Sequence, residues 1–154
     1  MARVERAFRA LLELSWAERA TLLEAWLLIP MVAIGLRLFG YRRVRDAVGG
    51  RHRHATGQDL AQARAAARLV RAAAAAAWTL PRPSCLTRSL VLERMLRRSG
   101  LAAELRIGVE RSNGNFAAHA WVEHACVALA EPEDVSTRYA VFATVPDGPA
   151  QPPP

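Results

Sequence analysis

A cysteine at the start of a predicted helix is the residue in this chain best suited to covalent chemistry. The run Pro-Arg-Pro-Ser before Cys85 keeps the chain extended, because a residue that precedes proline is pushed out of the α region, and Ser84 is a good N-cap. The pattern predicts a helix that begins at Cys85 and runs to Ser99, before Gly100. A thiol in the first turn meets unpaired N–H groups and the positive end of the helix dipole, and both favour the thiolate. Cys85 is therefore the candidate nucleophile.

A histidine follows on a predicted hairpin. Apolar residues alternate with others over Leu105–Val109, and a polar, Gly-containing loop leads to a second strand over 116–123. This pattern is typical of two antiparallel strands. On the second strand His119, Trp121 and Glu123 share one face. An imidazole can act as general base toward a thiol and then as general acid, so His119 is the candidate partner of the cysteine.

The order of helix and hairpin resembles that of papain-like and transglutaminase-like enzymes, in which a thiolate on a helix meets an imidazole on the packed sheet. The segments CLTRSL at 85–90, LRIGV at 105–109 and HAWVE at 119–123 make the resemblance more specific. Together they resemble the transglutaminase-like cysteine peptidase that matures lasso peptides. That family removes the leader from a ribosomally made precursor, so that a partner cyclase can close the ring.

The resemblance implies a role for each site residue. It implies Cys85 as nucleophile, His119 as general base and later general acid, and a carboxylate that orients the imidazole. The family usually has an Asp about a dozen residues after the histidine, and here position twelve after His119 is Glu131. Glu133 and Asp134 are nearby competitors, so the acid is open among the three, with Glu131 first.

The segment after the hairpin departs from the family pattern. The family has an Asp-Gly type turn there, which supplies positive φ at little cost, whereas this chain offers His124-Ala125. We therefore expect another type of turn or a longer one. Short strands are expected over 126–129 and 139–143, with Cys126 as a small core residue. Two cysteines, one of them needed as a free thiolate, argue against a structural disulfide and for a reducing cytoplasm.

Helices are expected in front of the cysteine. An amphipathic helix is predicted over residues 2–14, and Ser15–Glu18 has the pattern of a capping box that opens a second, strongly apolar helix to about Leu38. The uncharged run between Glu24 and Arg37 spans 12 residues, fewer than the roughly 20 that a bilayer requires. A core helix or a hydrophobic docking surface is therefore favoured over peripheral membrane attachment.

A linker and a third helix follow. The basic, Gly-containing segment 41–53 predicts the linker, and residues 56–59 are expected to cap an Ala-rich helix that continues to Trp78, because alanine is the best helix former. The pair His52 and His54 has no Cys or carboxylate cluster at ligand spacing beside it, so a solvated loop is favoured over a metal site.

Composition limits the classes of function. The 154 residues favour one domain with a real core. The net charge of +7 comes from 21 basic and 14 acidic residues, and every basic residue is Arg, which is typical of a GC-rich bacterial genome. The charge suits an acidic partner or a membrane surface, but aromatics make up 6% of the chain and are not interleaved with basic residues, which argues against nucleic acid. No site for a metal, ATP or a redox cofactor is visible.

We expect an α+β fold, in which N-terminal helices precede a papain/transglutaminase-like core of one Cys-bearing helix packed on a small antiparallel sheet. Residues 1–54 would form the helical region and linker, 55–145 the core, and 146–154 a disordered Pro-rich tail. The resemblance implies a cytoplasmic peptidase that acts through a thioester with a separate leader-recognition protein and a lasso cyclase, because the N-terminal helices leave no segment for a recognition domain. A transglutaminase-like acyltransferase and a non-catalytic scaffold remain the alternatives.

Overall fold

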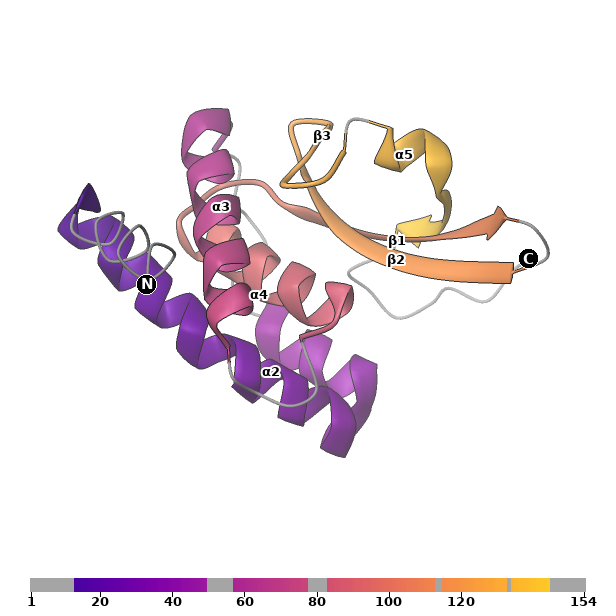
Figure 1. The fold of residues 1–154 in the computed structure, drawn as a ribbon, viewed down its shortest axis with the longest axis horizontal. Helices are drawn as coiled ribbons and strands as arrows, with labels where there is room; N and C mark the ends of the chain where they lie inside the picture. Colours follow the sequence, from indigo (N-terminus) through magenta and orange to yellow (C-terminus); the bar gives the residue numbers. More distant parts are fainter. Residues whose placement is uncertain (1–12, 50–56, 78–82, 113–114, 133, 145–154) are drawn as a thin grey trace, which may run out of the picture.

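Helices come first in this chain, and a small antiparallel sheet follows them (Figure 1). The computed structural model describes residues 13–49, 57–77, 83–112, 115–132 and 134–144. These ranges form the expected α+β fold. Its elements are α2 (Trp16–Gly49), α3 (Leu60–Ala76), α4 (Cys85–Arg98), β1 (Glu104–Ser112), β2 (Asn115–His124), β3 (Val127–Ala128), α5 (Val135–Arg138) and β4 (Ala140–Thr144). Several predictions lie outside the described residues: the first helix apart from residues 13 and 14, the pair His52 and His54, Trp78, and the tail over 146–154.

Helix α2 begins at the predicted capping box and runs beyond its predicted end. The Ser15 N–H donates to Glu18 Oε2 at 2.9 Å, and the Glu18 N–H donates to Ser15 Oγ at 3.3 Å. These bonds satisfy backbone groups that a first helical turn leaves unpaired. Instead of ending near Leu38, the helix continues to Gly49 across a kink at Gly40, whose φ is 76°. Glycine enters this left-handed region at little cost, so the kink redirects the helix without ending it.

The prediction of a linker over 41–53 is wrong for its first part, because residues 41–49 are helical. Val44 is buried, and Arg45 Nη1 lies 3.5 Å from the carboxylate of Glu93 in α4. Arg97 Nη2 lies 3.1 Å from the same carboxylate, which is 2% exposed. A basic, Gly-containing composition predicts a loop only where no distant residue holds the segment. Here a buried carboxylate far along the chain does so.

Side-chain caps fix the starts of α3 and α4. The Asp59 side chain accepts a hydrogen bond from the Gln62 N–H at 2.9 Å. Ser84 Oγ accepts one from the Thr87 N–H at 3.1 Å. Each cap satisfies an N–H group that has no partner within the helix. The prediction that the helix begins at Cys85 is thus confirmed.

Three arginines lie near the end of α4, where positive charge suits the helix dipole and a solvent-facing position is the simple expectation. For two of them this expectation is wrong. Arg98 is exposed and pairs with Glu24 in α2 at 2.8 Å. Arg94 instead donates to the Val48 carbonyl at 3.5 Å, and Arg97 binds the buried carboxylate described above. The part of α2 beyond the kink at Gly40 packs over the C-terminal end of α4. The sequence pattern of α4 alone could not predict that contact.

The sheet has the strand order β3-β2-β1-β4, and its central pair is the predicted hairpin. The register places Gly108 of β1 opposite His119 of β2. Helix α4 lies between the other helices and the sheet, and Ser89 Oγ donates to the Ala120 carbonyl at 2.8 Å. Val122 and Leu105 join the buried core on this side of the sheet. The helix that begins with Cys85 is therefore held directly against the strand that carries His119.

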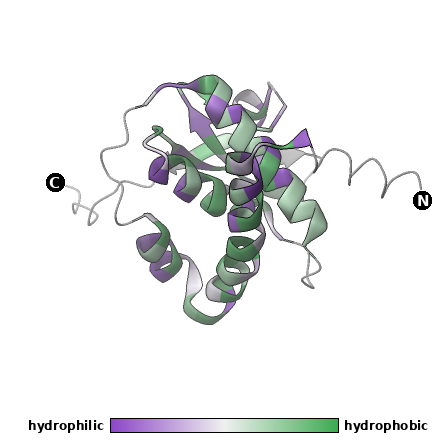
Figure 2. Cartoon of the chain, turned by 90° about the vertical axis from the view of Figure 1, so that its left-hand side faces the viewer, coloured by the Kyte–Doolittle hydropathy of each residue, from purple (hydrophilic) through white to green (hydrophobic). Residues whose placement is uncertain are grey.

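Helix α2 is apolar along much of its length (Figure 2), and several of its large apolar side chains are exposed. Among the described residues, it is the helix long and apolar enough to cross a membrane by length and composition, and 17% of its most apolar window is buried. We call its exposed stripe the α2 apolar face; it consists of Leu23, Leu27, Met31, Ile34 and Leu38, each more than half exposed. The residues recur every three or four positions, so they share one side of the helix.

Candidate active site

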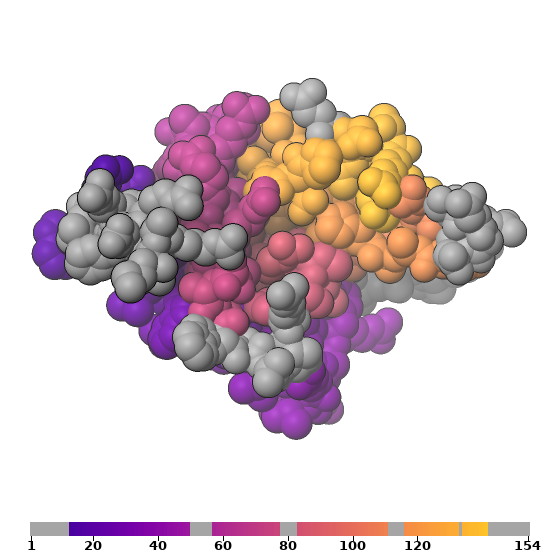
Figure 3. Space-filling model, in the orientation of Figure 1, coloured from indigo at the N-terminus to yellow at the C-terminus, as the bar shows by residue number. Residues whose placement is uncertain are grey.

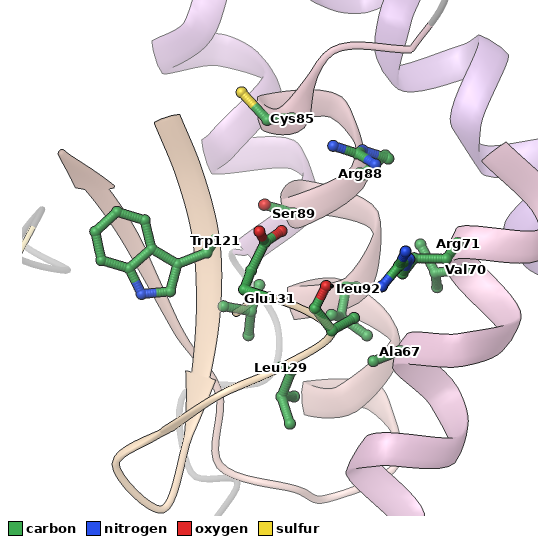
Figure 4. Close-up of a pocket in the computed structure, with 12 residues that line it drawn as sticks. Ala67, Val70, Arg71, Cys85, Arg88, Ser89, Leu92, Trp121, Leu129 and Glu131 are labelled. Atoms are coloured by element: carbon green, nitrogen blue, oxygen red, sulfur yellow. Dashed lines mark hydrogen bonds between the residues drawn. The ribbon is translucent and has the colours of Figure 1, made fainter. Parts of the chain in front are cut away.

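Cys85 lies half-buried at the first position of α4 and lines a small cavity (Figure 4). The cavity measures about 20 Å³, enough for about one water molecule. Arg88 and Ser89 of α4 continue its wall below the cysteine, and Glu131 faces them. Trp121 of β2 also lines the cavity, but its indole ring points away from α4. Because Cys85 begins the helix, its thiol is next to N–H groups that have no partner within the helix. These N–H groups can donate hydrogen bonds to an anion formed nearby.

His119 meets a carboxylate on the segment between β3 and α5. Its Nε2 lies 3.0 Å from Glu131 Oε2, and the two side chains are 18% and 21% exposed. When the imidazole is protonated, this contact is a charge-assisted hydrogen bond. With Nε2 engaged by the carboxylate, Nδ1 is the ring atom left to serve a nucleophile, as in a triad where the base uses one nitrogen for each neighbour.

The contact between Cys85 and His119 that would complete a triad is not formed in this structure. Within the described ranges, no hydrogen bond joins Cys85 Sγ to the His119 ring, and the cavity beside Cys85 is lined by Glu131 and Trp121 rather than by the imidazole. Catalytic hydrogen bonds are often long in a site without substrate and tighten when it binds. The structure thus brings His119 and Glu131 together, and brings Glu131 and Cys85 to one cavity.

Of the other two candidate acids, the structure describes Asp134. It is exposed before α5, and its side chain makes no capping hydrogen bond there. Glu133 lies outside the described residues. Glu131 is therefore the described candidate acid that contacts the imidazole of His119.

Two aromatic side chains hold the imidazole from its sides. The Trp121 ring stacks on His119 with centroids 6.1 Å apart and an interplanar angle of 16°, and the Tyr139 ring lies 5.2 Å from the imidazole. Trp121 is itself fixed, because its Nε1–H donates to Glu123 Oε1 at 3.0 Å, while Arg106 Nε donates to the other oxygen of that carboxylate at 3.0 Å. Sequence reasoning placed Trp121 on the face of His119 but gave it no role, and no signal pointed to Tyr139.

Gly108 makes room for this aromatic packing. A Cβ added there would lie 2.9 Å from Tyr139 Cβ and 3.1 Å from Trp121 Cη2. Such distances are shorter than van der Waals contact, so any larger residue would push the rings apart. The glycine opposite His119 is therefore a requirement of the site.

The turn after β2 corrects two expectations. The hairpin closes in two residues, Ala125 and Cys126, with φ of 49° and 61°, between the paired residues His124 and Val127. Two positive φ values are the signature of the turn usually built from Asn-Gly, so a turn of another type or greater length does not occur. Cys126 is exposed in this turn and is no core residue. His124 is instead buried and anchors the turn, with Nδ1 bonded to the Ala102 carbonyl.

A comparison with protein families matches residues 26–144 to the model of the transglutaminase-like superfamily. The chain belongs to this superfamily. The match covers α2 from Trp26 onward, Cys85, His119 and Glu131, and β4. No curated protein and no solved structure matches the chain. Members of the transglutaminase-like superfamily are commonly cysteine-dependent enzymes, which suggests activity of the cysteine protease or acyltransferase type.

Proposed function

We propose that this protein is a cysteine peptidase that removes the leader from a ribosomally made lasso-peptide precursor. The observation that carries the proposal is the contact of 3.0 Å between His119 and Glu131, beside a cavity that Cys85 lines from the start of a helix. The superfamily supports thiol chemistry, and the three motifs described above support the lasso-peptide assignment. Both cysteines are free thiols, in keeping with a cytoplasmic setting.

The reaction proceeds through a thioester. His119 Nδ1 takes the proton of Cys85, and the thiolate attacks the scissile carbonyl carbon. The Cys85 backbone N–H, free at the helix start, donates to the oxyanion, and one such donor typically contributes about 10²–10³ in rate. His119 then gives its proton to the leaving amine, which departs as the thioester forms. Water, deprotonated by His119, hydrolyses the thioester, while Glu131 stabilises the imidazolium in both halves.

A separate leader-recognition protein and a lasso cyclase complete the proposed system. We assign the recognition protein to the α2 apolar face, because a contiguous stripe of exposed large side chains is unusual on a monomer and typical of an interaction surface. Leu27→Glu and Ile34→Glu, in the middle of the stripe, should abolish co-elution with the recognition protein. Sedimentation of the wild type with anionic vesicles, lost in the same variants, would assign the face to a membrane instead.

The test of the activity is mass spectrometry of a precursor peptide incubated with this protein and the recognition protein. We expect loss of the leader with the wild type and with Cys126→Ala, and intact precursor with Cys85→Ala. The Cys126 variant is the matched control, because it removes the other thiol of the chain from an exposed turn. Intact precursor in all samples, with the recognition protein bound, would refute the peptidase.

Two alternatives give different readouts in the same samples. An acyltransferase would transfer the acyl group of the thioester to an added primary amine, and the Cys85 thiolate would leave. The released fragment would then have the mass of the amide with that amine instead of the mass of the free acid. A non-catalytic scaffold would leave the two thiols alike, and alkylation by iodoacetamide would then be no faster at Cys85 than at Cys126 despite the helix start at Cys85.

A further inference from the structure

A cleft lined by arginines opens beside the candidate active site. Arg64, Arg68 and Arg71 recur on one exposed side of α3, and they face β3 and the segment that leads to α5 across a cleft of about 540 Å³. Figure 3 shows α3, in magenta, bordering that orange to yellow segment. Arg71 and Glu131 line both this cleft and the cavity of Cys85, so the two spaces adjoin. A peptide held at the thiol can therefore extend into the cleft.

The positive charge of the cleft is not balanced by its own walls. Among its described lining residues Glu131 is the acidic one, and its carboxylate is engaged by His119. Arg71 Nη1 donates to the Ala130 carbonyl at 3.1 Å, which fixes its guanidinium against the far wall. Hydrogen bonds from Ser15 lower the pKa of Glu18, and the charge of Arg68 adds a smaller effect in the same direction, yet Arg68 still lines the cleft.

Toward the nucleophile, the row of arginines continues. Arg88 lies one turn after Cys85 in α4 and lines the cavity together with Arg71 (Figure 4). Basic side chains thus border the path from the thiol to Arg64, near the N-terminus of α3. Such a path attracts a negatively charged chain and repels a basic one.

We propose that this arginine cleft binds acidic side chains of the substrate peptide, and so selects for an acidic segment on one side of the bond that is cleaved. The inference rests on the proposed peptidase function and specifies its substrate. Four residues of helix separate Arg64 from Arg68, a rise of about 6 Å. Two residues of an extended peptide span about 6.6 Å and place their side chains on the same side. Acidic residues at alternate positions of an extended substrate would therefore meet Arg64 and Arg68, and a guanidinium can bind a carboxylate through two N–H groups.

A peptide fits the site better than other polyanions. The arginines lie in a concave space that leads to a thiol, whereas a lipid surface is flat and would contact a convex one. The chain also lacks the interleaved aromatic residues on which nucleic-acid bases stack. An anionic vesicle or a nucleic acid is therefore the competing ligand that the experiment must distinguish.

The test measures binding with the full-length Cys85→Ala variant, so that no cleavage interferes. The probes are two rhodamine-labelled peptides, Ala-Glu-Ala-Glu-Ala-Glu-Ala and its Gln analogue, followed by fluorescence anisotropy at low and physiological salt. We expect tighter binding of the Glu peptide, and a loss of about fivefold or more when Arg64→Gln and Arg68→Gln are combined, since exposed ion pairs contribute modestly and additively. Raising the salt should reduce the difference between the two peptides.

Matched variants separate a site from a general charge effect. Arg42→Gln combined with Arg43→Gln removes the same charge from exposed positions of α2 that do not line the cleft, and should keep the affinity. Arg64→Lys with Arg68→Lys keeps the charge and should retain most of the binding. Equal loss in the α2 and α3 glutamine variants, or equal binding of the two peptides by the wild type, would overturn the proposal.

Two further probes test the competing ligands. Tighter binding of a single-stranded DNA oligomer or of anionic vesicles than of the Glu peptide, lost on changing the α3 arginines, would also overturn it. Because this assay involves no cleavage, its failure leaves the proposed peptidase intact. Failure of the precursor assay would instead refute the proposed peptidase function without affecting the measured peptide binding.

Discussion

Glu131→Gln tests the core of the proposed mechanism, because it keeps the size of the side chain and removes the charge that faces His119. The two groups lie 3.0 Å apart and are about one-fifth exposed, so the contact is neither fully solvated nor fully buried. A hydrogen bond to a charged group contributes about 1.5–3 kcal/mol. At 1.36 kcal/mol for each factor of ten in rate, loss of that bond from the transition state should lower kcat/KM about 10- to 150-fold.

The assay is the rate of leader removal, followed by mass spectrometry with the recognition protein in excess. In the proposed mechanism Glu131 stabilises the imidazolium that forms during the reaction, so kcat should fall while KM changes little. Glu131→Asp keeps the charge but shortens the reach, so its rate should lie between the wild type and the Gln variant. Thermal unfolding of each variant, followed by circular dichroism, separates a loss of fold from a loss of chemistry.

Asp134→Asn is the matched control, since it removes a carboxylate from the exposed start of α5. This variant should retain the wild-type rate. A wild-type rate for Glu131→Gln, together with a large loss for Asp134→Asn, would refute the assignment of the acid and the reasoning from geometry behind it.

Three further predictions concern stability and titration. Gly108→Ala should destabilise the fold by about 1–3 kcal/mol in urea unfolding, because its Cβ would crowd Tyr139 Cβ, the Ala140 carbonyl oxygen and the Trp121 ring; an unchanged midpoint would contradict that packing. Replacing Ala125 by Asn and Cys126 by Gly should raise stability by about 1–2 kcal/mol, because both positions have positive φ, and a loss of stability would show that the turn is read wrongly. Hydrogen bonds from the Ser15 N–H and, to a lesser extent, the Ser15 hydroxyl hold the pKa of Glu18 below its ordinary value of 4.5, so the capping contribution is present above that value and fades as the pH falls through the lower one. In an NMR titration Ser15→Ala should raise the pKa only in part, because the bond from the backbone N–H remains.

Local signals were sufficient to predict where the site begins. The extended prolines, Ser84 and the apolar periodicity predict the start of α4, because an N-cap and a helical face are properties of neighbouring residues. The alternation over β1 and β2 likewise predicts the hairpin and the place of His119. The family resemblance pointed to Glu131 first among three acids, and the structure puts its carboxylate beside the imidazole, while its role in catalysis stays a prediction.

Contacts between distant residues explain what the sequence left hidden. The second half of α2 is helical because Arg45 reaches Glu93 on another helix, and no local pattern contains that information. The turn at Ala125 and Cys126 adopts a conformation that neither residue favours, since strand pairing on both sides and the buried His124 impose it. Tertiary structure overrides local preference at these points.

The stack of Trp121 on His119 should make the proposed proton transfers visible in the fluorescence of the tryptophan. Indole emission shifts to shorter wavelength when the ring is shielded from water, and Trp121 is 1% exposed, whereas Trp16 and Trp26 are largely exposed. A protonated imidazole quenches a nearby indole, and the two ring centroids lie 6.1 Å apart, so the proton that His119 takes up in the proposed mechanism should dim the emission of Trp121. With every other tryptophan replaced by phenylalanine, stopped-flow fluorescence would follow the proton through a single turnover without any label.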